Sequence, residues 1–246
     1  MFKLKTSDIA EKQIGYLMAI NKAHLIMLVE EKILSKEVAK EISKALQKFD
    51  MNALPRSKVT GELPVSYLPI EEILIREVGD IAGNLHLARS NNDIGVTIGK
   101  MALRERLLDI IDSALELKNQ LLNCAEKHTE TIMVGYTHTQ HGQPTTMGHY
   151  MMAFADMLGR EIKRYMSAYF LCNHSSMGAA AITTSGFPVS RLRVAELLAF
   201  DEVAENSYDA ISGADHIGEV ATSIQLACIN IGRVVYDFFI MVYRGI

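Results

Sequence analysis

Thr137, His138 and Gln143 lie close together in the segment Gly135–Pro144, which reads GYTHTQHGQP. A histidine side chain transfers protons near neutral pH without a strong shift of its pKa. A threonine hydroxyl and a glutamine amide are neutral hydrogen-bond donors of the kind that bind a carboxylate. The segment is polar, and glycine and proline bound it, which predicts an active-site loop between two long helices. Its chemistry would be proton transfer beside a bound carboxylate.

The pair His138 and His141 has the HxxH spacing that some metal sites use. Zinc sites usually add Glu, Asp or Cys ligands, and none accompanies this pair. The phosphate-loop, dinucleotide-binding and Ser-His-Asp patterns are absent from the sequence as well. We therefore predict that the site has no metal and no cofactor.

A second polar island, Leu85–Asp93, reads LHLARSNND, and a third spans Ser207–His216. The second island offers one fixed cation suited to a carboxylate and three neutral hydrogen-bonding side chains: Arg89, Ser90, Asn91 and Asn92. Asn92 or Asp93 is equally suited to capping a helix that begins there, and we expect Asp93 to act mainly as a cap. Three polar islands at helix ends can converge in a helical bundle and build one site.

Apolar residues at helical spacing predict the elements that position these islands. The expected helices are two short ones within 18–49, one over 70–81 ended by Gly83, and long ones over 93–128, 146–172 and 207–243. Ser35 is the expected N-cap of the second short helix. We expect the small-residue segment 177–188 to be a loop packed on other backbone. No strand pattern is convincing, so the predicted fold class is all-α with a long-helix bundle.

Composition excludes several classes of protein. The net charge of the 246 residues is -4, so no basic surface suggests a nucleic-acid partner. The three cysteines are not paired in sequence, which favours a reducing compartment. The N-terminal residues carry no apolar signal-peptide core. The apolar segment 221–243 is interrupted by polar side chains, so we expect a buried bundle helix, no membrane span and a cytoplasmic location.

Four motifs now resemble those of the argininosuccinate lyases, within the fumarase/aspartase superfamily. Leu85–Asp93 resembles LHTARSRND, and Gly135–Pro144 resembles GYTHLQRAQP. Met177–Arg191 resembles PLGSGAIAG followed by FPIDR, and Ser207–Asp215 resembles SLDAxSxRD. Tyr136 favours this branch over fumarases and adenylosuccinate lyases, which usually have GRTH at that place.

The resemblance implies a carbon–nitrogen lyase of amino-acid metabolism that eliminates fumarate in the anti sense from an N-substituted succinate. It implies an N-terminal helical domain at 1–88 and a central bundle domain at 89–246 that is incomplete at its C-terminal end. It also implies a cytoplasmic homotetramer with composite sites. By position, Thr137 and His138 match the catalytic Thr-His pair, with His138 as the acid-side or orienting group. Ser90 and Asn92 match carboxylate-binding residues, and Gln143 would line the pocket.

Several positions depart from the family pattern. Asn91 stands where the family has an arginine between the Ser and the Asn, and Ala214 and His141 replace two further arginines. Tyr67 stands where a histidine is expected. Loss of an arginine removes a fixed charge and a two-pronged donor. These changes weaken the prediction that argininosuccinate itself is the substrate.

The family's GSSxMPxKxNP loop, which carries the catalytic serine base, does not occur before Ile246. Ser175–Gly178, SSMG, lacks the Lys and Asn-Pro of that loop and falls where the family has PLGSG, so it is no substitute. The 246-residue chain alone is therefore expected to be inactive or nearly so. Two alternatives stay open: a catalytically impaired structural or regulatory homologue, and one half of a split lyase whose second polypeptide supplies the serine loop.

Overall fold

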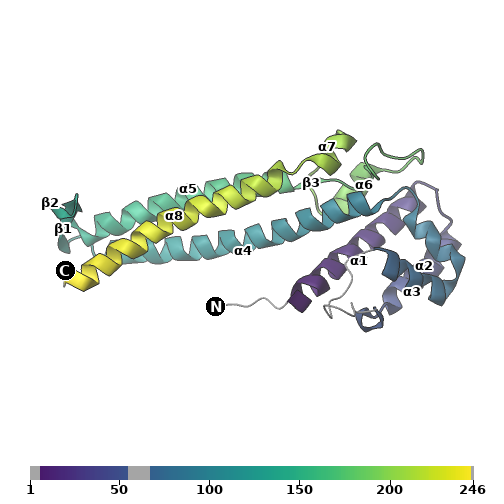
Figure 1. Ribbon diagram of the computed structural model, residues 1–246, viewed down its shortest axis with the longest axis horizontal. Coiled ribbons are helices and arrows are strands. Elements are labelled where there is room, and N and C mark those ends of the chain that lie inside the picture. The colour runs from purple at the N-terminus through teal and green to yellow at the C-terminus, as the bar shows by residue number, and fades with distance from the viewer. Residues whose placement is uncertain (1–5, 55–66, 245–246) are drawn as a thin grey trace. The chain divides into compact units, whose positions relative to one another are not determined.

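The computed structural model describes residues 6–54 and 67–244 and consists mainly of helices (Figure 1). The elements in chain order are α1 Thr6–Glu30, α2 Lys36–Lys48, η1 Met51–Ala53, α3 Tyr67–Val78, η2 Asp80–His86, α4 Asn91–Lys127, β1 Ile132–Thr137, β2 Gln140–Thr146, α5 Met147–Cys172, β3 His174–Ser175, α6 Arg191–Leu197, β4 Glu202–Val203, α7 Ser207–Ser212 and α8 Asp215–Arg244. The all-α fold class is confirmed. Residues 1–5, part of the segment used to argue against a signal peptide, lie outside the described residues.

The chain forms two compact units, one of residues 1–102 and 173–213 and the other of residues 103–172 and 214–246. Helix α4 begins in the first unit, and its residues from 103 onward belong to the second. These units are not the same division as the expected domains 1–88 and 89–246. The family boundary after residue 88 therefore stays a prediction.

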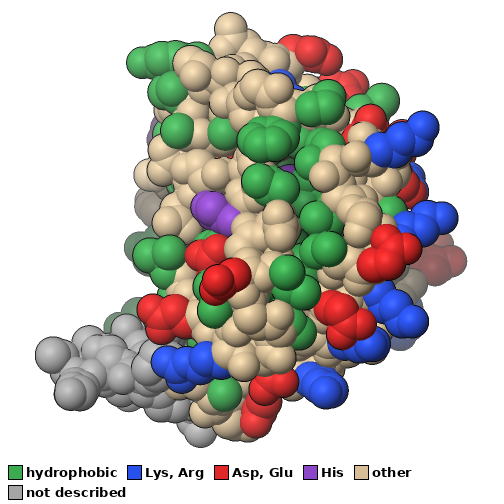
Figure 2. All heavy atoms as spheres, turned by 90° about the vertical axis from the view of Figure 1, so that its right-hand side faces the viewer, with side chains coloured by type: hydrophobic (Ala, Val, Ile, Leu, Met, Phe, Trp, Pro, Cys, Tyr) green, Lys and Arg blue, Asp and Glu red, His purple; other side chains and the backbone are tan. Residues whose placement is uncertain are grey.

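The first unit is built around α1. One face of α1 is fully buried at Ile14, Leu17 and Ile20, and it packs with the apolar faces of α2, α3 and α6 into one core. Ser35 caps α2 as expected, because its hydroxyl accepts a hydrogen bond from the Val38 N–H at 3.3 Å. Figure 2 shows one face of the molecule, on which basic and acidic side chains are interspersed along one side.

Three of the predicted helices differ from the structure. The first of the two short helices expected within 18–49 is the 25-residue α1, Thr6–Glu30, because its buried face continues back through Ile14 to Ala10. Helix α3 begins at Tyr67 and ends at Val78, because Gly79 adopts a φ of 76°, which a glycine allows and a continuing helix does not. The helix expected over 207–243 is two helices, since the chain is extended at Gly213 between α7 and α8. Helix α8 then begins at Asp215, an acidic residue in the first turn of that helix.

The second unit consists of the later part of α4 together with α5 and α8, which run alongside one another (Figure 1). Buried residues from all three helices form one core: Leu107, Ala114, Ile162, Tyr165, Ala168, Cys172, Val220 and Ala227. This arrangement agrees with the long-helix bundle that the sequence predicted.

Helix α8 differs from the expectation of a buried helix. By length and composition it could cross a membrane, and only 6% of its most apolar window is buried within the chain. The same test is passed by core helices of soluble proteins. Two of its polar side chains are bonded to α5: Asn230 donates to Glu161 at 2.8 Å, and Asp237 accepts from Tyr150 at 2.9 Å.

Candidate functional site

The polar segment Gly135–Pro144 is a β-hairpin, so the prediction of a loop without strands was wrong here. Strands β1 and β2 are antiparallel, with Thr137 opposite Gln140 and an irregularity in register between Val134 and Tyr136. A two-residue turn, His138-Thr139, joins the strands. Both turn residues have positive φ, 50° and 60°, which defines a type I′ turn.

The turn presents the predicted catalytic pair to solvent. Thr137 and His138 are exposed, as is Gln143 on the second strand. The rings of Tyr136 and His141 lie 5.2 Å apart, one on each strand. His138 and His141 are thus three residues apart on a hairpin, and among the described residues no three His, Cys, Asp or Glu side chains gather as a metal site.

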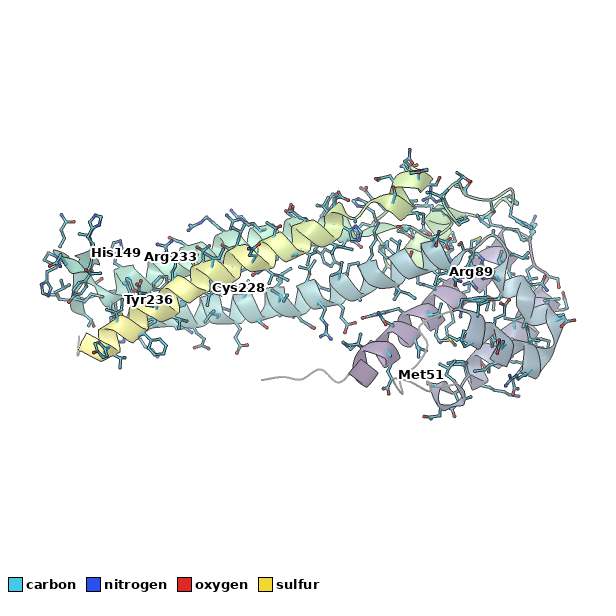
Figure 3. All side chains as sticks on the ribbon, viewed as in Figure 1. Met51, Arg89, His149, Cys228, Arg233 and Tyr236 are labelled. Atoms are coloured by element: carbon cyan, nitrogen blue, oxygen red, sulfur yellow. The ribbon has the colours of Figure 1, made fainter. Side chains whose placement is uncertain are left out.

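A cavity of about 700 Å³ lies in the second unit between the hairpin, the start of α5 and the end of α8. Its walls are mostly apolar, with a few polar side chains contributed by all of these elements: Thr137, Gln143, His149, Tyr150 and Asp237. Figure 3 shows His149 at the hairpin end of α5 and Tyr236 on α8. Burial, and the hydrogen bond to Asp237, raise the pKa of the Tyr150 hydroxyl. Gln143 and Thr137 line this cavity, and His138 does not.

The second polar island lies in the first unit, at the N-terminus of α4. Ser90 and Asp93 form a reciprocal cap: the Ser90 hydroxyl accepts from the Asn92 N–H at 3.3 Å, and the Asp93 carboxylate accepts from the Ser90 N–H at 3.0 Å. The cap leaves Asn91 and Asn92 exposed in the first turn. A helix N-terminus of this kind favours bound anions, because its N–H groups carry partial positive charge. The geometry suits a carboxylate ligand.

Arg89 is placed differently from the other members of this island. Its side chain is buried, donates to the Asn21 side chain at 2.8 Å, and lies over the Tyr67 ring with 4.9 Å to the ring centre. Its Nε and Nη2 have no hydrogen-bond partner among the described residues. Burial lowers the pKa of the guanidinium, although Tyr67 and Asp93 partly oppose that shift. In this structure Arg89 supports the start of α4 from inside the unit (Figure 3).

The predicted site residues thus form two groups. Arg89 and residues 90–92 lie together in the first unit, and Thr137, His138 and Gln143 lie together in the second. Their assignments as catalytic and substrate-binding residues stay predictions. Asn206, directly before the third island, caps α7 by accepting hydrogen bonds from the Tyr208 and Asp209 N–H groups.

Sequence reasoning missed two features of the site. Asp93 bonds not only its own helix but also the segment 178–180, and Tyr150 is bonded to Asp237 across two helices. Glycine and alanine enrichment around 177–181 was a signal for close packing, but the identity of its partner depends on contacts between distant parts of the chain. No local pattern reports those contacts.

The family model described as "Lyase" matches residues 2–244 of this chain. The chain belongs to this lyase family. The chain is 42% identical over 221 residues to argininosuccinate lyase 2 of Agrobacterium fabrum, and 38% identical over 213 residues to the argininosuccinate lyase of Methanocaldococcus jannaschii. The predicted resemblance to the argininosuccinate lyases is confirmed by these relatives. They align with 89% and 86% of this chain and with 44% of their own lengths, so the chain spans less than half of each relative.

Solved structures of lyase-family proteins have the same fold. An EDDS lyase variant with bound fumarate and EDDS lyase in complex with formate are each 32% identical to this chain, with TM-scores of 0.88 and 0.89. Both matches cover 95% of this chain and 46% of the solved chain. A class II fumarase from Schistosoma mansoni, 16% identical with a TM-score of 0.80, shares the fold over 98% of this chain and 59% of its own.

Proposed function

We propose that the protein is a carbon–nitrogen lyase that releases fumarate by anti elimination from an N-substituted succinate. The observation that carries the proposal is the lyase-family match over residues 2–244, since it includes all three polar islands. The relatives at 42% and 38% identity are named argininosuccinate lyases, and a related solved structure contains fumarate. The non-enzymatic alternative is not favoured by relatives of this kind.

The reaction needs a base, an acid and donors for carboxylates. Ser90 and Asn92 would bind a substrate carboxylate at the N-terminus of α4, where Asn91 and Asn92 are exposed and the helix dipole favours an anion. His138 would act as the acid-side or orienting group, with Thr137 beside it and Gln143 lining the pocket. The proton taken from the carbon next to the carboxylate needs a base, which in this family is the serine of the GSSxMPxKxNP loop.

The leaving group is the least determined part of the proposal. Asn91 is an exposed amide where argininosuccinate lyases have an arginine, so this position cannot form a two-pronged ion pair with a carboxylate. Two structural relatives are EDDS lyases, not argininosuccinate lyases. We therefore propose a small dicarboxylate of the N-succinyl class as substrate, with argininosuccinate and EDDS as the first compounds to assay.

Fumarate release from these compounds tests the proposal. We expect a protein that also contains the serine loop to be active, and the His138→Asn variant to lose about 10²–10⁴-fold in kcat/KM, the usual contribution of an acid–base group. His128→Asn is the matched control, because His128 bonds Thr131 at the end of α4, away from the turn. If the protein that contains the serine loop releases no fumarate from any N-succinyl compound, the proposal is wrong.

The isolated 246-residue chain is expected to release fumarate about 10²–10⁴-fold more slowly than a protein with the serine loop. If the enzyme is split, adding a second polypeptide that carries the loop restores the rate. If it is not, only a longer single chain is active. Turnover by the 246 residues alone at the rate of the longer protein would contradict the role given to the serine loop.

We further propose that the protein assembles as a cytoplasmic homotetramer. Supporting this, large apolar side chains of α8 are exposed in the single chain, among them Ile229, Tyr236 and Phe239. Monomeric soluble proteins rarely expose so large an apolar surface. The central helices of several copies would cover it.

A further inference from the structure

The Asp93 carboxylate joins the candidate substrate-binding turn to a segment far away in the sequence. Its Oδ1 accepts hydrogen bonds from the Ser90 N–H at 3.0 Å and the Ile94 N–H at 2.9 Å. Its Oδ2 accepts from the Gly178 N–H and the Ala180 N–H, both at 3.1 Å. The side chain is completely buried. Each oxygen thus holds one segment, and we call the arrangement the Asp93 clasp.

The clasp requires a carboxylate. All four partners are N–H donors, and an ionised carboxylate is the side chain that offers only acceptors. Asparagine has the same shape, but its NH₂ group would face two N–H donors, either those of 90 and 94 or those of 178 and 180. Burial raises the pKa of the Asp93 carboxyl above its ordinary value, and the hydrogen bonds from the N–H groups of Ser90, Ala180 and Gly178 oppose part of that rise.

The segment 178–180 is shaped to receive this carboxylate. Gly178 and Ala180 have φ values of 79° and 53°, on either side of Ala179. Left-handed residues alternating with other backbone geometry can turn their N–H groups into a concave anion-binding nest. A Cβ on Gly178 would lie 2.7 Å from Cγ of Arg191, so only glycine fits there. The protein's own carboxylate occupies the nest, and no other anion is needed to explain its shape.

Arg191 holds the far side of the same segment. Its Nε donates to the Met177 carbonyl at 3.3 Å, and its Nη1 and Nη2 donate to the carbonyls of Glu205 at 3.0 Å and Ala204 at 2.6 Å. The segment therefore lies between two charged side chains, one on each side. Asp93 and Asn92 bond residues 178–181 to the start of α4, and Lys100 of the same helix donates to Ser176 Oγ, just before the segment, at 3.1 Å.

Asn92 connects the clasp to the proposed substrate site. Its side-chain NH₂ donates to the Ala181 carbonyl at 3.0 Å, and its backbone N–H donates to the Ser90 hydroxyl. The orientation of the Asn92 amide and of the Ser90 hydroxyl therefore depends on where the segment 178–181 lies. A substitution at Asp93 that releases the segment therefore changes the orientation of both groups, although Asn92 and Ser90 themselves are not substituted.

We propose that Asp93 is a positioning residue for substrate binding: by clasping 178–180 to the start of α4, it holds Ser90 and Asn92 in the orientation that receives the substrate carboxylate. This inference rests on the proposed lyase function. Asp93 contacts only backbone N–H groups in this structure, so its effect on the reaction passes through its neighbours.

Asp93→Asn in the fumarate-releasing full chain tests the inference. We expect KM to rise about 10- to 100-fold while kcat changes by less than about threefold, because misplacing binding groups weakens binding more than chemistry when the acid and base are untouched. Amide hydrogen exchange at 178–180 should speed up in the same variant. Asp112→Asn, at an exposed position on the same helix, is the matched control and should leave both measurements unchanged.

Faster exchange at 178–180 with an unchanged KM would overturn the inference, as would a fall in thermal stability with no change in the ratio of KM to kcat. Arg191→Lys provides a second test, should Asp93→Asn fail to fold. It loosens the segment from the opposite side and leaves the Ser90–Asp93 cap intact, so a raised KM supports the inference and an unchanged KM contradicts it. A wild-type protein that contains the serine loop and still releases no fumarate would instead count against the proposed function, and hydrogen exchange would still report whether Asp93 holds the segment.

Discussion

The residue proposed for proton transfer stands at a conformationally costly position. His138 and Thr139 both adopt left-handed backbone geometry in a two-residue turn, where Asn-Gly is the favoured pair. A β-branched residue in this region is a genuine outlier. Strain of this kind is retained where the surrounding structure or the function requires it.

Replacing Thr139 by glycine should therefore stabilise the hairpin. We expect Thr139→Gly to raise the free energy of unfolding by about 0.5–1 kcal/mol, since relief of a strained φ outweighs the extra freedom of glycine in the unfolded chain. Urea denaturation measures the change. Thr137→Gly is the matched control: Thr137 is in β1, and glycine in a strand should lower stability by about 0.5–1 kcal/mol. A loss of stability in both variants would contradict the claim of strain at Thr139.

His24 makes the stability of the first unit depend on pH. The ring is 2% exposed and its Nε2 bonds the Leu87 carbonyl at 2.9 Å. Burial, with the nearby Arg89 charge, lowers its pKa from 6.5 to about 3. The folded protein therefore keeps His24 neutral at pH values where the unfolded chain binds a proton. Stability is then lost as the pH falls from about 6.5 towards 3, by up to about 1.4 kcal/mol per pH unit.

His24→Gln isolates this contribution, because the glutamine amide can still donate to the Leu87 carbonyl. At pH 7.5 we expect the variant to be less stable than the wild type by about 1–3 kcal/mol, the cost of imperfect packing. Below pH 6.5 that difference should shrink by about 1 kcal/mol per pH unit. His86, whose pKa burial also lowers, leaves a residual slope in the variant. Urea denaturation at pH 7.5, 6 and 5 measures the gap, and a constant gap would contradict the argument.

At the scale of elements, the junction between α4 and α5 depends on one glycine. The Gly148 N–H donates to the His128 carbonyl at 2.9 Å, so the first turn of α5 rests directly on the end of α4. A Cβ at this position would lie 2.7 Å from the Ala125 carbonyl oxygen and 2.9 Å from that of His128. Backbone atoms cannot move aside as a flexible side chain can. The hairpin of β1 and β2 connects α4 to α5 in the chain, so the contact of Gly148 with the end of α4 also positions the base of the hairpin.

Gly148→Ala should therefore destabilise the second unit by about 1–3 kcal/mol, the usual cost of overpacking. Gly159→Ala, on the same helix, is the matched control. Its added Cβ meets only the end of the Lys118 side chain, at 3.3 Å from Nζ, and alanine favours a helix by up to about 1 kcal/mol. Thermal denaturation should show the two variants moving in opposite directions. A similar melting temperature for both would show that α5 does not rest on α4 as described.

The long helices were predictable because their signal is local and repeated. Apolar periodicity over 93–128 and 146–172 predicted α4 and α5 to within about two residues. The hairpin between them was not predictable in this way. Its strands are rich in glycine and polar residues, most of their residues are exposed, and His-Thr is not a type I′ turn signature. The sequence did indicate candidate site residues in this hairpin, because Thr137, His138 and Gln143 are of types suited to proton transfer and carboxylate binding.

The contacts that arrange the candidate site needed the structure. The sequence predicted Asp93 as a helix cap, and the structure adds Ser90 to that cap. That Asp93 also binds Gly178 and Ala180, 85 and 87 residues away, follows only from the folding of α4 against the segment 177–181. The burial of Arg89 against Asn21 and Tyr67 could likewise not be read from its neighbours in sequence, and its ligand-binding role stays a prediction.

At the scale of the whole molecule, the apolar surface of α8 is the feature that a single chain does not explain. Ile229, Tyr236 and Phe239 are 55%, 66% and 72% exposed, and their spacing places them on one side of the helix. The opposite side packs on α5, through Val220 and Ala227 among others. At about 25 cal/mol per Å², covering such side chains yields a large gain in free energy. A second copy of the same surface can cover it in a symmetric assembly.

Introducing charge on this side of α8 tests whether copies of the chain cover it. We expect the wild-type protein to sediment as an oligomer and a triple variant, Ile229→Glu with Tyr236→Glu and Phe239→Glu, to sediment as a smaller species, because burying three unpaired carboxylates costs several kcal/mol per subunit interface. Leu192→Glu, an equally exposed apolar position on α6, is the matched control and should keep the wild-type mass. Analytical ultracentrifugation over a range of concentrations measures the masses. A wild-type protein that sediments as a monomer would mean that these side chains are covered by something other than a second copy, and binding to lipid vesicles would then identify the membrane as that partner.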